Sequence, residues 1–465
     1  MSFMFDFCVI ITITQNNQFY LRKDLDISKY IPNMHVSILF VLFPFATSFK
    51  WFPRSLSPPP IQNGFFGTIG PNVETTKVKS LAELFTGDGV IQGVFFKNGK
   101  PTFARHVIKT HKIVANESDD AMTLFCKYAL YKAGMYPYNT IGVANTALMA
   151  LSKPVDENTT AMYAIYERDL PYLVHLYHNT STIATVKKMD AFYPEIQELS
   201  GHSKMVTNIF ETLDYHVFAK TVDFFQMNEN LNTVLRVNTL NMRYIPVVHD
   251  FISTPSKYIV MDSPLVFDFF RLFVKKIPVV FRANLPSFFH VLDKANHKVE
   301  SYEVVRGYYI FHYATCEEFE DVIEICAPVY ENLDFSELNI CGKYRKMVLD
   351  KKTKQVRVVF HPELESLNLD FPIKTGDGKI VLRNIENKKV NGFVMVDGLK
   401  IVKKWLYDNV FFMGEHVVVG DVLMSFCVRD GANYLCMLHM RNDSIEFLSC
   451  SMDLTMGFHS TAIVM

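Results

Sequence analysis

The sequence predicts an all-β protein in which helices are insertions on a scaffold of sheets. From Ser55 onward, short runs rich in β-branched and aromatic residues recur at 90–96, 161–166, 258–261, 308–312, 355–360, 392–396 and 422–428. Turn sequences separate such runs at Lys97-Asn-Gly-Lys100, Thr375-Gly-Asp-Gly378 and Arg429-Asp-Gly431. This many short strands exceeds a single β-sandwich, which favours a propeller or a large barrel.

Segment 118–134 is the exception to the β pattern, and we predict a helix there. Its apolar residues recur at helical spacing, and Gly134 stands near its end. The apolar face consists of Met122, Leu124, Phe125, Tyr128, Leu130 and Tyr131. No sequence repeat of fixed period is present, so the number of propeller blades does not follow from the residues themselves.

Composition limits the classes of function. With 465 residues, 49% of them hydrophobic and 14% aromatic, the chain can bury a large core. The net charge is −1 and there is no long run of Lys or Arg, which argues against nucleic acid as a partner. The eight cysteines are scattered without a CxxC pair. This pattern argues against a zinc ribbon or a dense disulfide framework and favours a reducing compartment.

We divide the chain into an N-terminal segment, 1–55, and a main domain, 56–465, joined by the stiff Ser55-Leu-Ser-Pro-Pro-Pro60 connector. The apolar tract 36–49 is too short to cross a bilayer easily. It could be buried, it could serve as a signal peptide if translation begins at Met34, or it could dip into a membrane to collect an apolar substrate. We therefore expect a cytoplasmic or peripheral membrane protein, with secretory and plastid targeting left open.

Four histidines in apolar or turn-rich surroundings are candidate metal ligands: His202, His249, His312 and His459. A neutral imidazole offers one nitrogen to a metal near pH 7, so four converging imidazoles would suit iron, copper or zinc. A single such histidine is more often a core or surface residue. His175 and His178 would be a metal pair only on a helix, and the alternating residues around them indicate a strand.

Several motifs occur in the order typical of one family. They are Asn63-Gly-Phe-Phe-Gly-Thr-Ile-Gly-Pro-Asn72, Gly87-Asp-Gly-Val-Ile-Gln-Gly-Val94, Val143-Ala-Asn-Thr-Ala-Leu148, Tyr166-Glu-Arg-Asp-Leu-Pro-Tyr172, His249-Asp-Phe251 and Gly457-Phe-His459. Together they resemble the carotenoid cleavage oxygenases over the region from Pro58 to the C-terminus. The resemblance implies a seven-bladed β-propeller whose helical and loop insertions form a cap over an iron centre.

The same resemblance implies the site residues. The iron, Fe(II), would be bound by His202, His249, His312 and His459. Iron-bound imidazoles need an acceptor for their second N–H. The matching carboxylates are Glu167, Asp370 and Glu415. Asp370 stands where the family has a glutamate, so we expect its hydrogen bond to a ligand to be longer or water-mediated. No catalytic residue beyond the iron site is implied.

The implied activity is Fe(II)-dependent oxidative cleavage of a carbon–carbon double bond in a carotenoid or apocarotenoid. The partners would be an apolar polyene and O2, and the products two carbonyl fragments. Cleavage of a stilbenoid, cis/trans isomerisation, and a catalytically silent propeller that binds an apolar ligand stay open as alternatives. Thr68, Gln92 and Ser203 depart from the family pattern, yet none removes a ligand, so we expect folding and metal binding to survive.

Overall fold

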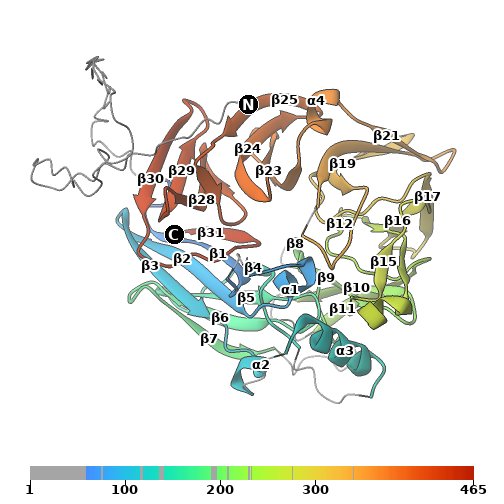
Figure 1. Cartoon of the computed structure of the whole chain (residues 1–465), viewed down its shortest axis with the longest axis horizontal. Helices are drawn as coiled ribbons and strands as arrows, with labels where there is room; N and C mark the ends of the chain where they lie inside the picture. Colours follow the sequence, from blue (N-terminus) through green and yellow to red (C-terminus); the bar gives the residue numbers. More distant parts are fainter. Residues whose placement is uncertain are drawn as a thin grey trace, which may run out of the picture. The chain divides into compact units, whose positions relative to one another are not determined.

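The protein is built mainly of antiparallel sheets, as the sequence predicts. The computed structural model describes residues 59–465 except 75–76, 116–118, 136–140, 190–195, 207–208, 229–230, 232, 275 and 339. The predictions for the N-terminal segment, including its apolar tract, lie outside the described residues. The sheets follow one another around a common centre (Figure 1).

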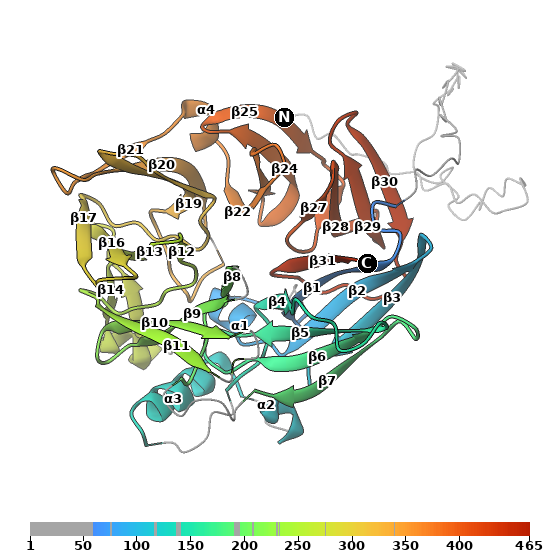
Figure 2. The same ribbon diagram turned by 180° about the vertical axis from the view of Figure 1, so that it is seen from behind.

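The first sheet joins the two ends of the described chain. The strand near the beginning pairs with the last strand, so that Gly64 lies opposite Val464. In spatial order the sheet consists of β3 (Lys100–Val107), β2 (Gly89–Lys97), β1 (Gly64–Pro71) and β31 (Ser460–Val464). The blue β1 and the red β31 lie side by side when the molecule is seen from either side (Figures 1 and 2).

Each of the next two sheets is a four-stranded meander. One consists of β4 (Ala147–Ala150), β5 (Thr159–Ile165), β6 (Tyr172–Tyr177) and β7 (Thr182–Lys188). The other consists of β8 (Lys204–Val206), β9 (Ile209–His216), β10 (Thr221–Asn228) and β11 (Val234–Asn241). His175 therefore lies on a strand, as its alternating neighbours predict.

Two further four-stranded sheets follow. The first consists of β12 (Ile252–Ser253), β13 (Lys257–Asp262), β16 (Ser287–Asp293) and β17 (Val299–Val304), and between its strands lies the short pair β14 (Leu265–Phe267) and β15 (Val279–Phe281). The second consists of β18 (Thr315–Glu318), β19 (Val322–Tyr330), β20 (Gly342–Asp350) and β21 (Val356–Val359).

The last sheet has nine strands. They fall into two groups that β26 (Val410–Phe412) joins by pairing with β24 and β28. The first group consists of β22 (Leu369–Lys374), β23 (Ile380–Glu386), β24 (Lys389–Asp397) and β25 (Lys400–Leu406). The second consists of β27 (Val417–Val419), β28 (Val422–Arg429), β29 (Ala432–His439) and β30 (Ser444–Ser449).

Buried apolar clusters join each sheet to the next. For example, Phe65 of β1 packs with Val174 of β6, and Phe224 of β10 packs with Tyr258 of β13. Another cluster links β28 back to β1, which completes a ring. The core thus lies between neighbouring sheets, an arrangement that is propeller-like.

Two of the three predicted turns form tight two-residue hairpins. Asn98 and Gly99, between β2 and β3, have φ values of 50° and 72°, and Asp430 and Gly431, between β28 and β29, have 50° and 76°. Two successive positive φ values are the signature of a type I′ turn, which Asn-Gly and Asp-Gly sequences favour. Here the local sequence alone determines the connection.

Short helices lie outside the sheets. The predicted helix is confirmed as α3 (Ala121–Lys132), although only Leu124 and Tyr128 of its predicted apolar face are buried and Leu130 is exposed. The described residues also form α1 (Leu81–Phe85), α2 (His111–Val114), α4 (Pro362–Glu365) and the 3-10 helix η2 (Phe269–Val274).

One predicted strand is wrong. Segment 308–312 forms no strand and has a single bridge, from Tyr309 to Tyr330. Its consecutive apolar residues are all buried because the segment runs into the interior, where Tyr309 and Phe311 belong to a core cluster. Burial on all sides produces the same apolar run as a buried strand, so periodicity does not separate the two.

Candidate metal centre

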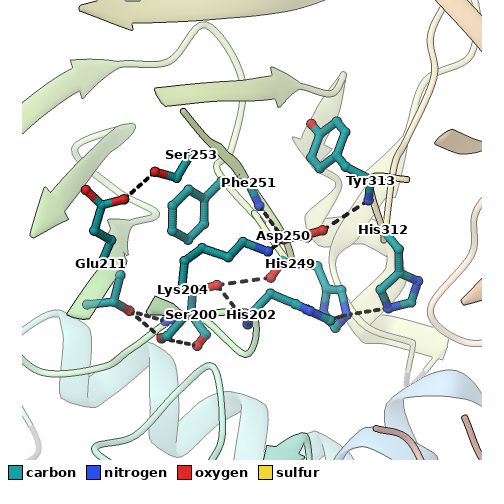
Figure 3. Close-up of polar contacts among 12 residues, drawn as sticks. Ser200, His202, Lys204, Glu211, His249, Asp250, Phe251, Ser253, His312 and Tyr313 are labelled. Carbon is teal, nitrogen blue, oxygen red and sulfur yellow. Dashed lines mark hydrogen bonds and ion pairs between the residues drawn. The ribbon is translucent and has the colours of Figure 1, made fainter. Parts of the chain in front are cut away.

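The four candidate histidines converge at the centre of the ring. Their potential ligand atoms all lie within 4.8 Å of one another. The Nε2 atom of His202 is 3.2 Å from that of His249 and 3.0 Å from that of His459, and the Nε2 atoms of His249 and His312 are 3.2 Å apart. Figure 3 shows the rings of His202, His249 and His312 turned toward one another.

The sheet topology explains this convergence. Each histidine lies in an irregular segment shortly before a strand at the edge of a different four-stranded sheet, namely β8, β12, β18 or β31. Residues hundreds of positions apart in the chain thereby come to equivalent places around one centre. This placement depends on closure of the ring and is invisible in any local window of sequence.

Three carboxylates, of which Asp370 and Glu415 are buried and Glu167 is half-buried, orient three of the imidazoles. The Nδ1 of His249 contacts Oε1 of Glu167, the Nδ1 of His312 is 2.8 Å from Oδ1 of Asp370, and the Nδ1 of His459 is 3.3 Å from Oε1 of Glu415. An acceptor at Nδ1 holds the proton there and leaves the Nε2 lone pair free for a metal. The fourth ring, that of His202, has no such carboxylate contact among the described residues.

Asp370 makes a direct contact, so the expected longer or water-mediated bond is not found. Strand pairing between β22 and β23 shifts register immediately after Asp370. This irregular backbone puts the short side chain within reach of His312, which compensates for the missing methylene.

Burial favours the neutral form, with a free lone pair, at two of the four imidazoles. Burial and the neighbouring imidazoles lower the pKa of His202 well below its usual value, and burial lowers the pKa of His459. Burial has the same tendency at His249, but the charge and hydrogen bond of Glu167 outweigh it and raise the pKa. Four imidazole nitrogens directed at one point, three of them backed by carboxylates, fit a divalent transition metal.

Asp250 ties three of the histidine-bearing segments together, a role that the sequence did not reveal. Its Oδ1 accepts a bond of 2.6 Å from Lys204 Nζ, two residues after His202, and its Oδ2 accepts one of 3.0 Å from the backbone N–H of Tyr313, next to His312. Figure 3 shows both contacts. In the sequence, the only sign of this role is an acidic residue inside the His249-Asp-Phe251 motif.

The three residues that depart from the family pattern form hydrogen bonds to segments that carry histidines. Thr68 Oγ1 donates to the carbonyl of His459 at 3.2 Å. The amide of Gln92 donates to the carbonyl of Thr455 at 3.0 Å and accepts from its N–H at 2.7 Å. Ser203 Oγ donates to the carbonyl of Ser200 at 2.9 Å, which fixes the turn beside His202. None of the three lies in the position of a metal ligand.

His178, which the sequence spacing raised as a candidate, and His106 both lie apart from this group. His178 Nε2 is 2.9 Å from Thr160 Oγ1, and His106 Nε2 is 2.8 Å from Thr185 Oγ1. Both contacts join neighbouring strands or turns. Among the described residues, the only cluster of His, Cys, Asp and Glu with metal-binding geometry is the four histidines.

Comparison with known families agrees with the motifs. The family model described as retinal pigment epithelial membrane protein matches residues 57–388. A 9-cis-epoxycarotenoid dioxygenase of Oryza sativa subsp. japonica, a chloroplastic protein, is 22% identical over 238 residues, 46% of this chain and 40% of that protein. A carotenoid 9,10(9',10')-cleavage dioxygenase of Pisum sativum is 25% identical over 355 residues, 72% of this chain and 62% of that protein. The matches thus span less than two thirds of these relatives.

Solved structures share the fold. A variant of the apocarotenoid oxygenase of Synechocystis superposes with a TM-score of 0.67 at 17% identity, covering 88% of this chain and 94% of that one. The lignostilbene dioxygenase of Pseudomonas brassicacearum gives a TM-score of 0.67 at 16% identity, covering 88% and 93%. In the part of the chain that the structure describes, no helix has the length and apolar character needed to span a membrane.

Proposed function

Because the chain belongs to the family of carotenoid cleavage oxygenases, we propose that it is an Fe(II)-dependent dioxygenase acting on a carotenoid or apocarotenoid. It would cleave one carbon–carbon double bond with O2 and release two carbonyl products. The single observation that carries this proposal is the convergence of four imidazoles within 4.8 Å, three of them backed by carboxylates.

We assign the iron ligands to His202, His249, His312 and His459, with Glu167, Asp370 and Glu415 as their orienting partners. Iron bound there supplies O2 activation beside the substrate. An all-imidazole set leaves the positive charge of the metal uncompensated by directly bound carboxylates. The protein's task is to hold the imidazole tautomers, exclude water and place one double bond of the polyene at the centre.

We further propose that residues 56–465 form one seven-bladed propeller domain. Five four-stranded sheets and the two strand groups of the nine-stranded sheet would be the blades. The helical insertions would cap the iron centre. In support, the ring of Phe85 on α1 lies 6.4 Å from Phe311 and 5.8 Å from Phe458, the residues that precede His312 and His459.

Anaerobic reconstitution with Fe(II), followed by carotenoids, apocarotenoids and stilbenes under O2, tests the activity. Two carbonyl products from a polyene, identified by mass, are expected. His249→Ala should abolish iron binding and cleavage, whereas the matched control His175→Ala, on β6, should retain both.

Other outcomes select the alternatives. Products from stilbenes alone would mean a stilbenoid-cleaving enzyme. A geometric isomer of the polyene, formed without O2 uptake, would mean an isomerase. Protein that binds no iron, or whose iron affinity is unchanged in His249→Ala, would leave a silent propeller that binds an apolar ligand.

We also propose that the domain contacts a membrane peripherally through η2. This short helix exposes Phe270 and Phe273 by 82% and 85% and also exposes Phe269, Leu272 and Val274. Such an exposed apolar cluster is typical of a surface that enters the lipid interface. Sedimentation with neutral phosphatidylcholine vesicles should detect binding, and Phe270→Ser with Phe273→Ser should weaken it. Equal binding by this double variant would refute the assignment.

A further inference from the structure

The Phe371 ring lies against two of the four histidines, and the Arg383 guanidinium lies over the Phe371 ring. The ring centroid of Phe371 is 4.4 Å from that of His312 and 5.0 Å from that of His459. The guanidinium carbon of Arg383 lies 3.5 Å from the centre of the Phe371 ring. Both residues are only 8% exposed. A cation, an aromatic ring and two imidazoles are therefore in direct contact inside the protein.

The backbone places Phe371 there at a cost. Its φ of 54° lies in the left-handed region, which is unfavourable for a bulky residue. The pairing of β22 with β23 shifts register between Asp370 and Ile373, so Phe371 lies at the irregularity. Irregularities of this kind re-aim a side chain that a regular strand would direct elsewhere. The strained residue is the one whose ring touches the histidines.

An ordinary ion pair does not explain why the charged Arg383 is buried. It lies directly across from Asp370 in the register of β22 and β23. The Asp370 carboxylate, however, already accepts bonds from His312 Nδ1, Tyr330 Oη and the N–H of Phe371. The Nε atom of Arg383 is buried without a hydrogen-bond partner among the described residues.

Keeping this charge inside the protein is unfavourable for folding. A buried guanidinium stays charged, and burial of such a cation without full hydrogen bonding is costly. The contact with the Phe371 ring and the nearby carboxylates of Asp370 and Glu415 offset part of that cost.

We propose that Phe371 and Arg383 are positioning residues for the metal centre: the Phe371 ring fixes the planes of His312 and His459, and the Arg383 charge favours the ferrous over the ferric ion. This inference rests on the proposed function, because it assumes iron at the four histidines. An added positive charge disfavours the more highly charged ion. By Coulomb's law, a unit charge about 10 Å from the metal at an effective dielectric constant of about 20 changes the ferric-to-ferrous ratio about tenfold.

The charge is tested with Arg383→Gln and Arg383→Lys, loaded with Fe(II) and poised at a fixed potential with mediators. The ferric fraction is read by electron paramagnetic resonance. Arg383→Gln should raise the ferric-to-ferrous ratio about tenfold, and Arg383→Lys should stay close to the wild type. Arg429→Gln is the matched control, because Arg429 also lies over a ring, that of Phe447 at 4.8 Å, but outside the centre. An unchanged ratio in Arg383→Gln, or an equal shift in Arg429→Gln, would refute the electrostatic role.

The ring is tested with Phe371→Leu and Co(II), whose visible spectrum reports ligand geometry. We expect an altered spectrum and about 10- to 100-fold weaker Co(II) binding, as for other residues that orient ligands. A wild-type spectrum and affinity would refute the role of the ring.

His249→Ala separates a failure of the proposed iron site from a failure of the positioning role. If it retains metal, the proposed iron site fails; if it loses metal while Phe371→Leu and Arg383→Gln behave as wild type, only the positioning role fails.

Discussion

Substitution of Asp370 by asparagine tests how far the carboxylates beside the imidazoles control the centre. Asp370 is 3% exposed and its two oxygens accept three bonds, from His312 Nδ1 at 2.8 Å, Tyr330 Oη at 2.6 Å and the Phe371 N–H at 2.8 Å. Asparagine keeps the shape but has one acceptor oxygen and no charge. The oxygen can still accept from His312, while the amide must face Tyr330, whose hydroxyl can rotate to accept.

The expected loss follows from the change of bond type. Hydrogen bonds to a charged group contribute about 1.5–3 kcal/mol, against about 0.5–1.5 kcal/mol for neutral ones. The difference of about 1–2 kcal/mol corresponds to roughly 5- to 30-fold in metal affinity. This agrees with the about 10- to 100-fold loss seen when a partner of a metal-bound histidine is removed.

The assay is anaerobic competition between the protein and a chelator for Co(II) or Fe(II). Asp377→Asn is the control, because Asp377 lies in the turn between β22 and β23, far in the chain from any histidine ligand, and bonds Thr375 and Lys379. Affinity of Asp370→Asn within about twofold of the wild type, below the loss expected for such a partner, would contradict the reasoning. So would an equal loss in Asp377→Asn.

Of three further predictions, two concern the stability of the scaffold and one concerns metal binding. Glu211→Gln should lower the free energy of unfolding at pH 7 by about 1 kcal/mol. Burial raises the pKa of Glu211, but hydrogen bonds from its lysine, serine and glutamine neighbours outweigh burial and lower the pKa below 4.5. The stabilisation by the ionised carboxylate is therefore present above pH 4.5 and is lost as the pH falls through the folded-state pKa. Urea denaturation at several pH values should show the two proteins converging in acid. Phe224→Ala should cost about 3–5 kcal/mol, because the Phe224 ring stacks on Tyr258 at 4.5 Å in the core, whereas Phe218→Ala, 56% exposed, should cost under about 0.5 kcal/mol in the same experiment. Asp250→Asn should weaken Co(II) binding about tenfold by loosening three histidine-bearing segments, and unchanged affinity in a chelator competition would count against that role.

Local sequence determined much of the scaffold. Type I′ turns at Asn98-Gly99 and Asp430-Gly431 follow from residues that tolerate positive φ. Strands and the helix at Ala121–Lys132 follow from the period of their apolar residues. The same rule failed at 308–312, because a segment buried on all sides has no polar face to reveal its conformation.

The residues of the candidate centre could also be identified from the sequence, but only as members of ordered motifs. Which residues pair with one another by hydrogen bonds could not be predicted. Thr68 and His459, which share a hydrogen bond, are 391 residues apart, and Gln92 and Thr455 are 363 apart. Such contacts exist only after the ring of sheets has closed, so no local pattern encodes them.

The sequence by itself therefore determined the all-β class, the turns and the histidines and carboxylates worth testing. Tertiary structure alone decided which carboxylate faces which imidazole, that Asp370 reaches His312 directly, and that Phe371 and Arg383 lie behind the centre. The physical reason is one of range: backbone preferences act over a few neighbouring residues, whereas burial and electrostatics act between side chains that only the closed fold brings together.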